Sequence, residues 1–283
     1  MPRRGDDGAE SIEQERNRAL LGWYATNQRD LPWRGIRDPY AILVSEVMLQ
    51  QTQVARVIPF FERFLTEFPT VGALAAAPLR EVLAVWNGLG YNSRAQRLHL
   101  AAGEIAANGW PATVEGLTKL PGIGEYTAQA LACFAYGLDV VPVDTNLRRV
   151  LSRWHGEPLK GRALQTIAGA DAGDSTHSAW TQAVMDLGSA LCLPRTPRCD
   201  SCPVSSWCTG PDVYVAPRSQ ARFEGSGRQL RGAIIRSLVA NPATIDELAA
   251  ETGFPPVGVH EALEDLVSEG LVEEANSRFQ LPE

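Results

Sequence analysis

Apolar residues recur at helical spacing through the first 210 residues of this 283-residue chain, and this periodicity constrains the fold more than any other feature. One such helical face consists of Val54, Val57, Ile58, Phe61 and Leu65. Proline and glycine separate the periodic segments, and no segment alternates apolar and polar residues for long enough to require a sheet. The periodicity therefore predicts an all-α fold.

The formal net charge of −7 is unevenly distributed along the chain. Residues 1–210 contain 20 Lys and Arg against 21 Asp and Glu, whereas residues 211–283 contain 6 against 12. An acidic balance argues against a nucleic-acid partner, because phosphate binding draws on excess basic charge. That objection applies to the last quarter of the chain and leaves the first 210 residues open to nucleic-acid binding.

The sequence contains neither a membrane span nor a secretory signal. No window approaches the roughly 18 consecutive apolar residues that a membrane helix needs. The N-terminal stretch MPRRGDDGAESIEQER is charged and lacks an apolar core. We therefore expect a cytoplasmic protein.

The C-terminal quarter reads as a linker followed by a small module. Residues 211–228 are rich in Gly, Pro and Ser and lack helical periodicity, which is typical of a linker. Three helical patterns and an apolar-rich end follow in residues 229–283, an arrangement that resembles a winged-helix module. Its third helix carries the acidic residues Glu261, Glu264, Asp265 and Glu269, which repel DNA. This pattern favours packing or contact with a protein partner over duplex binding.

The segment Leu120–Gly124 combines a proline with two glycines directly before a helical pattern. Pro121 ends any preceding helix, while Gly122 and Gly124 allow a tight turn that leaves amide N–H groups at a helix N-terminus. Such amides can hold a phosphate oxygen. An ordinary turn between two helices has the same pattern, but with helices predicted on both sides it resembles the hairpin of helix-hairpin-helix DNA-binding proteins.

Two carboxylates occupy positions with contrasting surroundings. Glu46 lies in the strongly apolar segment from Tyr40 to Leu49, where burial raises the pKa of a carboxyl group unless it is paired. Asp144 immediately precedes a helical pattern, at a polar helix start where a carboxylate is expected to stay ionised. A structural ion pair for Glu46 and a simple helix cap for Asp144 are the alternatives.

Four of the five cysteines fall within one short segment with the spacing Cys192-x6-Cys199-x2-Cys202-x5-Cys208. Clustering of this kind in a reducing compartment indicates metal ligation rather than disulfides. Four thiolates can surround either a zinc ion or an iron–sulfur cluster, so the chemistry alone leaves both open.

Several motifs, in this order, give the chain a family resemblance. They are LPWR (31–34), SEVMLQQTQV (45–54), GLGY (88–91), LPGIGEYTA (120–128), VDTN (143–146) and the four cysteines. From about residue 11 to 210 the chain resembles the A/G-specific adenine DNA glycosylases (MutY type) of the helix-hairpin-helix glycosylase superfamily. The resemblance implies an enzyme of base-excision repair that removes adenine opposite guanine or 8-oxoguanine in double-stranded DNA.

The resemblance also implies a domain organisation and a cofactor. It implies an N-terminal helix in residues 1–30 that packs on a cluster domain, a helical barrel in residues 31–137 with its helix-hairpin-helix at about 115–135, and the cluster domain itself in residues 138–210. The cysteine spacing matches the [4Fe–4S] loop of the family. We expect a structural role for this cluster.

Site residues follow from the resemblance by matching positions. Glu46 is the acid that protonates adenine, and Asp144 stabilises the sugar cation or attacks it transiently. Tyr126 and Asn146 order these catalytic groups. Gln51 and Tyr91 insert into the duplex so that the adenine leaves the stack, while Trp33, Arg34 and Leu49 line the base pocket. Gly122 and Gly124 contact the DNA backbone.

Position 126 also bears on strand cleavage. In the related endonuclease III branch a lysine at this position forms a Schiff base, but here the residue is Tyr126, and the only lysines are Lys119 and Lys160. We therefore expect a monofunctional glycosylase that leaves an abasic site.

Two departures from the family pattern bear on specificity. The large C-terminal domain that reads 8-oxoguanine in typical members has no counterpart in residues 211–283, so recognition of the opposite base is open. Thr145 stands where many members have glycine. A T:G or U:G mismatch glycosylase of the same superfamily and a non-catalytic DNA-damage-binding protein are the alternative functions. The residues Gln50, Gln51 and Thr52 argue against the first, and the pair Glu46 and Asp144 argues against the second.

Overall fold

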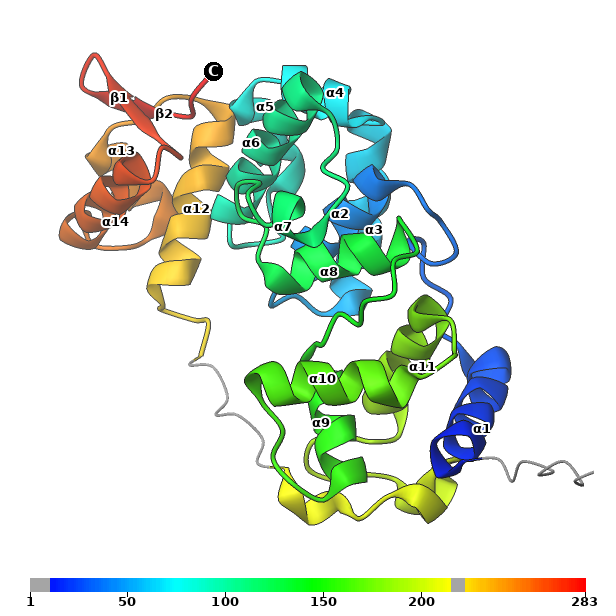
Figure 1. Cartoon of the computed structure of the whole chain (residues 1–283). Coiled ribbons are helices and arrows are strands. Elements are labelled where there is room, and N and C mark those ends of the chain that lie inside the picture. The colour runs from blue at the N-terminus through cyan, green and yellow to red at the C-terminus, as the bar shows by residue number, and fades with distance from the viewer. Residues whose placement is uncertain (1–10, 215–221) are drawn as a thin grey trace, which may run out of the picture. The chain divides into compact units, whose positions relative to one another are not determined.

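A computed structural model describes residues 11–214 and 222–283 of the chain, and within these ranges the only strands are β1 (Glu273–Ala275) and β2 (Arg278–Gln280) (Figure 1). All other regular elements are helices, which confirms the predicted all-α class. No helix in the described ranges is long and apolar enough to cross a membrane. Residues 1–10 of the expected N-terminal segment and 215–221 of the expected linker lie outside the described residues.

The described residues form two compact units. The hairpin unit consists of residues 31–128 and 222–283, and the cysteine unit consists of residues 11–30 and 129–214. The C-terminal module therefore groups with the segment that contains the predicted hairpin. Helix α8 (Glu125–Phe134) begins in the hairpin unit and ends in the cysteine unit.

Helix α2 is the central helix of the hairpin unit. Residues Tyr40–Met48 are all buried, as expected for a helix that is apolar on every side. Asp38 caps its N-terminus, where the carboxylate accepts a hydrogen bond from the Tyr40 amide at 3.0 Å. The helices of this part are α2 (Pro39–Leu49), α3 (Val54–Glu67), α4 (Val71–Ala76), α5 (Leu79–Trp86), α6 (Ser93–Asn108) and α7 (Val114–Leu117).

The C-terminal module has the predicted three helices and a terminal ribbon. They are α12 (Gly227–Ala240), α13 (Ile245–Thr252), α14 (Pro256–Ser268) and the antiparallel pair β1–β2. The module contacts α5, where the Arg80 amide donates to the Pro282 carbonyl at 3.1 Å. It also contacts α6, where Gln96 Nε2 donates to the carbonyls of Glu269 and Gly270 at 2.9 Å each. These contacts are non-local in sequence, so no local pattern predicts them.

The cysteine unit surrounds a core that includes Leu20, Leu147 and Trp180. The Ser11–Gln14 capping box is present at the start of α1, with both reciprocal hydrogen bonds formed. Arg16 anchors α1 through an ion pair with buried Asp171 at 2.6 Å. The helices of this unit are α1 (Ile12–Asn27), α9 (Thr145–His155), α10 (Gly161–Ala172) and α11 (His177–Ala190), followed by the short 3-10 turns η1 (Cys199–Ser201), η2 (Ser205–Trp207) and η3 (Pro211–Val213).

Candidate active site

Glu46 is a buried carboxyl group on the central helix of the hairpin unit. Its side chain is 8% exposed, and it stands among the buried apolar residues of α2. Leu49, at the end of the same helix, is partly exposed. Trp33 is also partly exposed and meets Phe61 edge to face, with ring centroids 5.4 Å apart. The hairpin unit thus contains an acid in apolar surroundings and an aromatic side chain that retains a solvent-accessible part.

The two residues predicted to insert into the duplex, Gln51 and Tyr91, are called the wedge residues below, and both have left-handed backbones. Gln51 has φ 57° and Tyr91 has φ 52°, and both follow a helix by a few residues. Among the described non-glycine residues, only the tip of the β1–β2 hairpin shares this conformation. A left-handed conformation costs a residue with a Cβ about 1–3 kcal/mol and persists only where surrounding contacts hold it.

Buried Arg94 supplies those contacts, and the sequence analysis did not identify it. Its Nη1 donates to the carbonyl oxygens of Val47 and Met48 at 2.8 Å and of Gln50 at 2.5 Å, and its Nη2 donates to Thr52 Oγ1 at 3.1 Å and the Gly90 carbonyl at 3.0 Å. One guanidinium thus closes the C-terminal end of α2 and joins the turn of Gln51 to the turn of Tyr91. Burial lowers the pKa of Arg94 to about 10.

The hairpin glycines precede α8 and are both exposed. Gly122 has φ +74°, and a Cβ placed there would lie 2.6 Å from Cβ of Arg97. Gly124 has open space around it. In the part of the chain that the structure describes, neither glycine amide donates to another backbone carbonyl, so both stay available to a ligand. Tyr126 lies in the first turn of α8 and is partly buried.

Asp144 is the N-cap of α9 in the cysteine unit. Its carboxylate accepts hydrogen bonds from the Leu147 amide and from Asn146 Nδ2, each at 2.7 Å. Desolvation raises the pKa of Asp144 above its ordinary value, while these two hydrogen bonds act in the opposite direction. The sequence predicted an ionised Asp144 from its polar helix start. Because desolvation disfavours the charged carboxylate, its ionised form depends on the hydrogen bonds from Leu147 and Asn146.

Asn146 is itself held by buried Arg149. Arg149 Nη2 donates to Asn146 Oδ1 at 2.8 Å and to the Gly188 carbonyl at 2.7 Å, and its Nε donates to the Cys192 carbonyl at 2.7 Å. Gly188 leaves room for this arrangement, since a Cβ there would lie 2.7 Å from Cβ of Asn146. Thr145 is exposed at the first position of α9.

The four loop cysteines line one shared cavity of about 170 Å³. Burial raises the pKa of Cys202 to about 11 and raises that of Cys208, so these thiols are poor thiolates until a cation compensates their charge. Arg153 joins the loop to α9, with Nη1 3.1 Å from Cys192 Sγ. Within residues 11–214 and 222–283, no group of three or more His, Cys, Asp or Glu side chains is close enough to hold a single metal ion.

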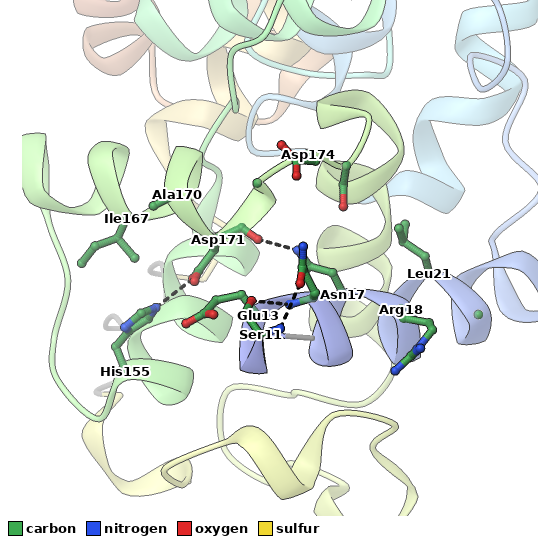
Figure 2. Close-up of a pocket in the computed structure, with 14 residues that line it drawn as sticks. Ser11, Glu13, Asn17, Arg18, Leu21, His155, Ile167, Ala170, Asp171 and Asp174 are labelled. Atoms are coloured by element: carbon green, nitrogen blue, oxygen red, sulfur yellow. Dashed lines mark hydrogen bonds and ion pairs between the residues drawn. The ribbon is translucent and has the colours of Figure 1, made fainter. Parts of the chain in front are cut away.

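A cavity of about 970 Å³ in the cysteine unit contains none of the predicted site residues. It lies between α1 and α10, and Figure 2 shows the carboxylate of Asp171, one of its lining residues, paired with His155, while Asn17 donates to the Asp171 backbone carbonyl. His155 Nε2 lies 2.8 Å from Asp171 Oδ2, opposite the ion pair with Arg16. This carboxylate holds α1, α9 and α10 together and is already fully partnered.

The predicted residues divide between the two units. The hairpin unit contains the proposed acid, the base-pocket and DNA-contact residues and Tyr126, namely Glu46, Trp33, Arg34, Leu49, Gln51, Tyr91, Gly122, Gly124 and Tyr126. The cysteine unit contains Asp144, Asn146 and the four loop cysteines. Arg94 and Arg149 are the additional residues that the structure identifies. Each binds main-chain carbonyls, which leave no pattern in the sequence.

Comparison with known proteins identifies relatives over most of the chain. Residues 44–167 match the HhH-GPD superfamily of base excision DNA repair proteins. The adenine DNA glycosylase of Mycolicibacterium smegmatis is 43% identical over 278 residues, covering 93% of this chain and 94% of the relative. The adenine DNA glycosylase of Mycobacterium tuberculosis is 40% identical and covers 93% and 92%. The match to the human adenine DNA glycosylase, 41% identical, covers 83% of this chain but only 44% of the human protein.

Solved structures share the fold. A thermostable thymine-DNA glycosylase superimposes with a TM-score of 0.67 at 28% identity, covering 71% of this chain and 96% of that one. An endonuclease III–DNA complex superimposes with a TM-score of 0.58 at 22% identity, covering 70% and 95%. The mycobacterial matches reach further and extend into the C-terminal module. With this identity over nearly its whole length, the chain belongs to the adenine DNA glycosylases of the helix-hairpin-helix superfamily.

Proposed function

We propose that this protein removes adenine mispaired with guanine or 8-oxoguanine from double-stranded DNA, by hydrolysis of the N-glycosidic bond. The observation that carries the proposal is the pair of carboxyl groups in contrasting surroundings. Glu46 is buried in an apolar helix, whereas Asp144 caps a helix and accepts two hydrogen bonds. Such a pair suits glycosidic cleavage, which needs both a proton donor and an anion.

In this mechanism Glu46 delivers its proton to a ring nitrogen of adenine and so makes the base a better leaving group. Asp144 stabilises the oxocarbenium-like sugar, and a water molecule completes the hydrolysis. Asn146 is a positioning residue, because its Nδ2 hydrogen bond at 2.7 Å favours the ionised form of Asp144. Tyr126, in the first turn of α8, helps to order the catalytic groups.

The same proposal assigns the DNA contacts. Gln51 and Tyr91 enter the duplex, and the adenine moves into a pocket lined by Trp33, Arg34 and Leu49. Exposed Gly122 and Gly124 offer their amides to a phosphate at the start of α8. Their neutral donors explain how a chain of net charge −7 binds DNA. The proposal includes a cytoplasmic location on the DNA of the nucleoid, where such a substrate would be found.

We also propose that the four loop cysteines hold a [4Fe–4S] cluster. The x6-x2-x5 spacing of the four cysteines matches the [4Fe–4S] loop of the family that this chain resembles, whereas a zinc ion is the smaller alternative. The shared cavity of about 170 Å³ suits a larger group. When bound, the group supplies positive charge for four thiolates and thereby fixes the loop.

The cluster assignment is tested by visible absorbance and iron analysis of the purified protein. Cys202→Ser is expected to lose iron, whereas Cys133→Ala is the matched control, because Cys133 is buried outside the loop. Stoichiometric zinc without iron would contradict the assignment.

The activity is tested with duplexes that contain A:8-oxoguanine, A:G, T:G or U:G, followed by alkali. Adenine release is expected, and Glu46→Gln abolishes it, while Glu62→Gln, on an exposed position of α3, leaves it intact. Release confined to T:G or U:G would refute adenine specificity, and binding without release would refute catalysis.

Monofunctional action has its own test. We expect no strand cleavage and no covalent adduct on borohydride treatment, because position 126 is tyrosine. Trapping that disappears in Lys119→Ala would overturn this expectation, since Lys119 is exposed next to the hairpin.

A further inference from the structure

The hairpin unit contains a second large cavity, of about 780 Å³, where α12 lies beside the turns that carry Gln51 and Tyr91. Both left-handed residues line it. Strained backbone of this kind is held by surrounding contacts and concentrates at active sites and ligand-binding sites. The C-terminal module therefore contributes one wall of a cavity whose opposite wall holds the proposed wedge.

Positive charge of the C-terminal module is concentrated at this cavity. Residues 222–283 contain five arginines and no lysine, and Arg228, Arg231 and Arg236 line the cavity. The same residues contain eleven carboxylates, of which only Glu251 lines it. Arg56, at the start of α3, adds a fourth guanidinium from the opposite wall. The acidic module thus presents three of its five arginines at one place.

The arginines differ in their existing contacts. Arg228 Nη1 donates to the Tyr91 hydroxyl at 3.0 Å and so joins α12 to the wedge. Arg231 Nη2 pairs with Glu269 at 2.6 Å, a half-exposed ion pair that leaves further N–H donors on the guanidinium. Arg236 is exposed. Arg231 and Arg236 can therefore bind an anion without breaking the fold.

We propose that α12 binds backbone phosphates of the DNA beside the wedge residues, so that the C-terminal module forms part of the DNA-binding surface. This inference rests on the proposed function, because it takes Gln51 and Tyr91 as the residues that enter the duplex. The module uses its first helix for this contact. Its third helix, α14, carries Glu261, Glu264 and Asp265, whose charge opposes DNA.

The test measures binding of the full chain to an A:G duplex with a non-hydrolysable adenine nucleotide, over a series of salt concentrations. Each phosphate contact contributes about 0.9 to the slope of log K against log salt. The double variant R231A/R236A is expected to reduce that slope by nearly 2. Arg278→Ala is the matched control, since Arg278 pairs with Glu247 at 2.7 Å in the same module but lies outside the cavity.

Two further measurements separate the outcomes. R231K/R236K restores the slope if the contact is electrostatic, and equal melting temperatures of all variants exclude unfolding as the cause. A slope in R231A/R236A equal to that of Arg278→Ala would overturn the inference. Adenine release by the unaltered protein is measured separately, so a loss of slope without any release contradicts the proposed catalysis and leaves the phosphate contact supported.

Discussion

Replacement of Arg94 by methionine is expected to destabilise the hairpin unit by about 4 kcal/mol. The side chain is 6% exposed and makes five hydrogen bonds, all to acceptors in the α2 end and the two wedge turns. The two Nη groups carry four N–H donors shared among these five acceptors, and at roughly 1.5–2 kcal/mol for each charged donor they stabilise the fold by about 7 kcal/mol. Burial lowers the pKa of Arg94 from 12.5 to about 10, which corresponds to a cost of about 3 kcal/mol that methionine avoids.

Urea unfolding combined with hydrogen exchange measures this effect. Two compact units permit two transitions, so exchange in the peptides of residues 39–52 identifies the unit that is destabilised. Arg94→Lys keeps the charge but loses the planar guanidinium, so its unfolding free energy is expected to lie between those of the parent protein and Arg94→Met. Arg80→Met is the control, because the Arg80 side chain forms an exposed ion pair at 3.6 Å with Glu283, worth about 0–1 kcal/mol.

The expected loss of about 4 kcal/mol is a large part of the stability of a domain, so it is readily measured. A loss of unfolding free energy below about 1 kcal/mol in Arg94→Met, or unchanged exchange in residues 39–52, would refute the reasoning. DNA binding reports the same defect independently. The turns of Gln51 and Tyr91 lose their shared donor, so the variant is expected to bind an A:G duplex more weakly than Arg80→Met does.

Three other changes have defined outcomes. Asn146→Ala removes a hydrogen bond that lowers the pKa of Asp144, so the acid limb of single-turnover adenine release shifts to higher pH. Because desolvation raises the folded-state pKa of Asp144, the native protein holds this proton more tightly than the unfolded chain, and the contribution of Asp144 to stability falls as the pH rises from 3.8 through that pKa. Asp144→Asn, which keeps a good N-cap, should therefore gain stability over the parent chain in urea unfolding at pH 7 relative to pH 4. Gly122→Ala, with φ +74° and a clash with Arg97, is expected to lose at least about 1 kcal/mol and weaken DNA binding, whereas Gly124→Ala has open space and serves as its control.

Local patterns predicted the helices because helix starts and apolar faces are written in neighbouring residues. A hydroxyl residue followed three positions later by Gln or Glu indicates a capping box, and such boxes form at Ser11–Gln14 and Thr244–Glu247. The apolar run around Glu46 is the buried helix α2. The role of Arg94 was not predicted, because most of its partners are not neighbours in the sequence. Three of its partners are main-chain carbonyls 44 to 47 residues away, and a carbonyl has no residue identity. An arginine between Ser93 and Ala95 therefore looks like any surface charge.

The C-terminal module shows the same limit at a larger scale. Local patterns in the sequence predicted the helices of the module. Its charge was considered only as a total, and an acidic total predicts that the segment repels DNA. The folded module separates the charges, since the spacing of Arg228, Arg231 and Arg236 places them along one side of α12 beside the cavity. Total charge describes a segment, whereas binding depends on which residues share a face.

The cysteine loop connects to the chemistry through the same kind of main-chain contact. Asp144 needs Asn146 to favour its ionised form, Asn146 accepts a hydrogen bond from Arg149, and Arg149 Nε donates to the Cys192 carbonyl. Arg153, one turn later on α9, holds the carbonyls of Leu193 and Pro194. A loop that carries four thiols gains a fixed shape when its thiolates are neutralised, and these two arginines transmit that shape to the helix that Asp144 caps. Under the proposed function, the cysteine loop therefore supports Asn146 and Asp144, a role that requires no electron transfer.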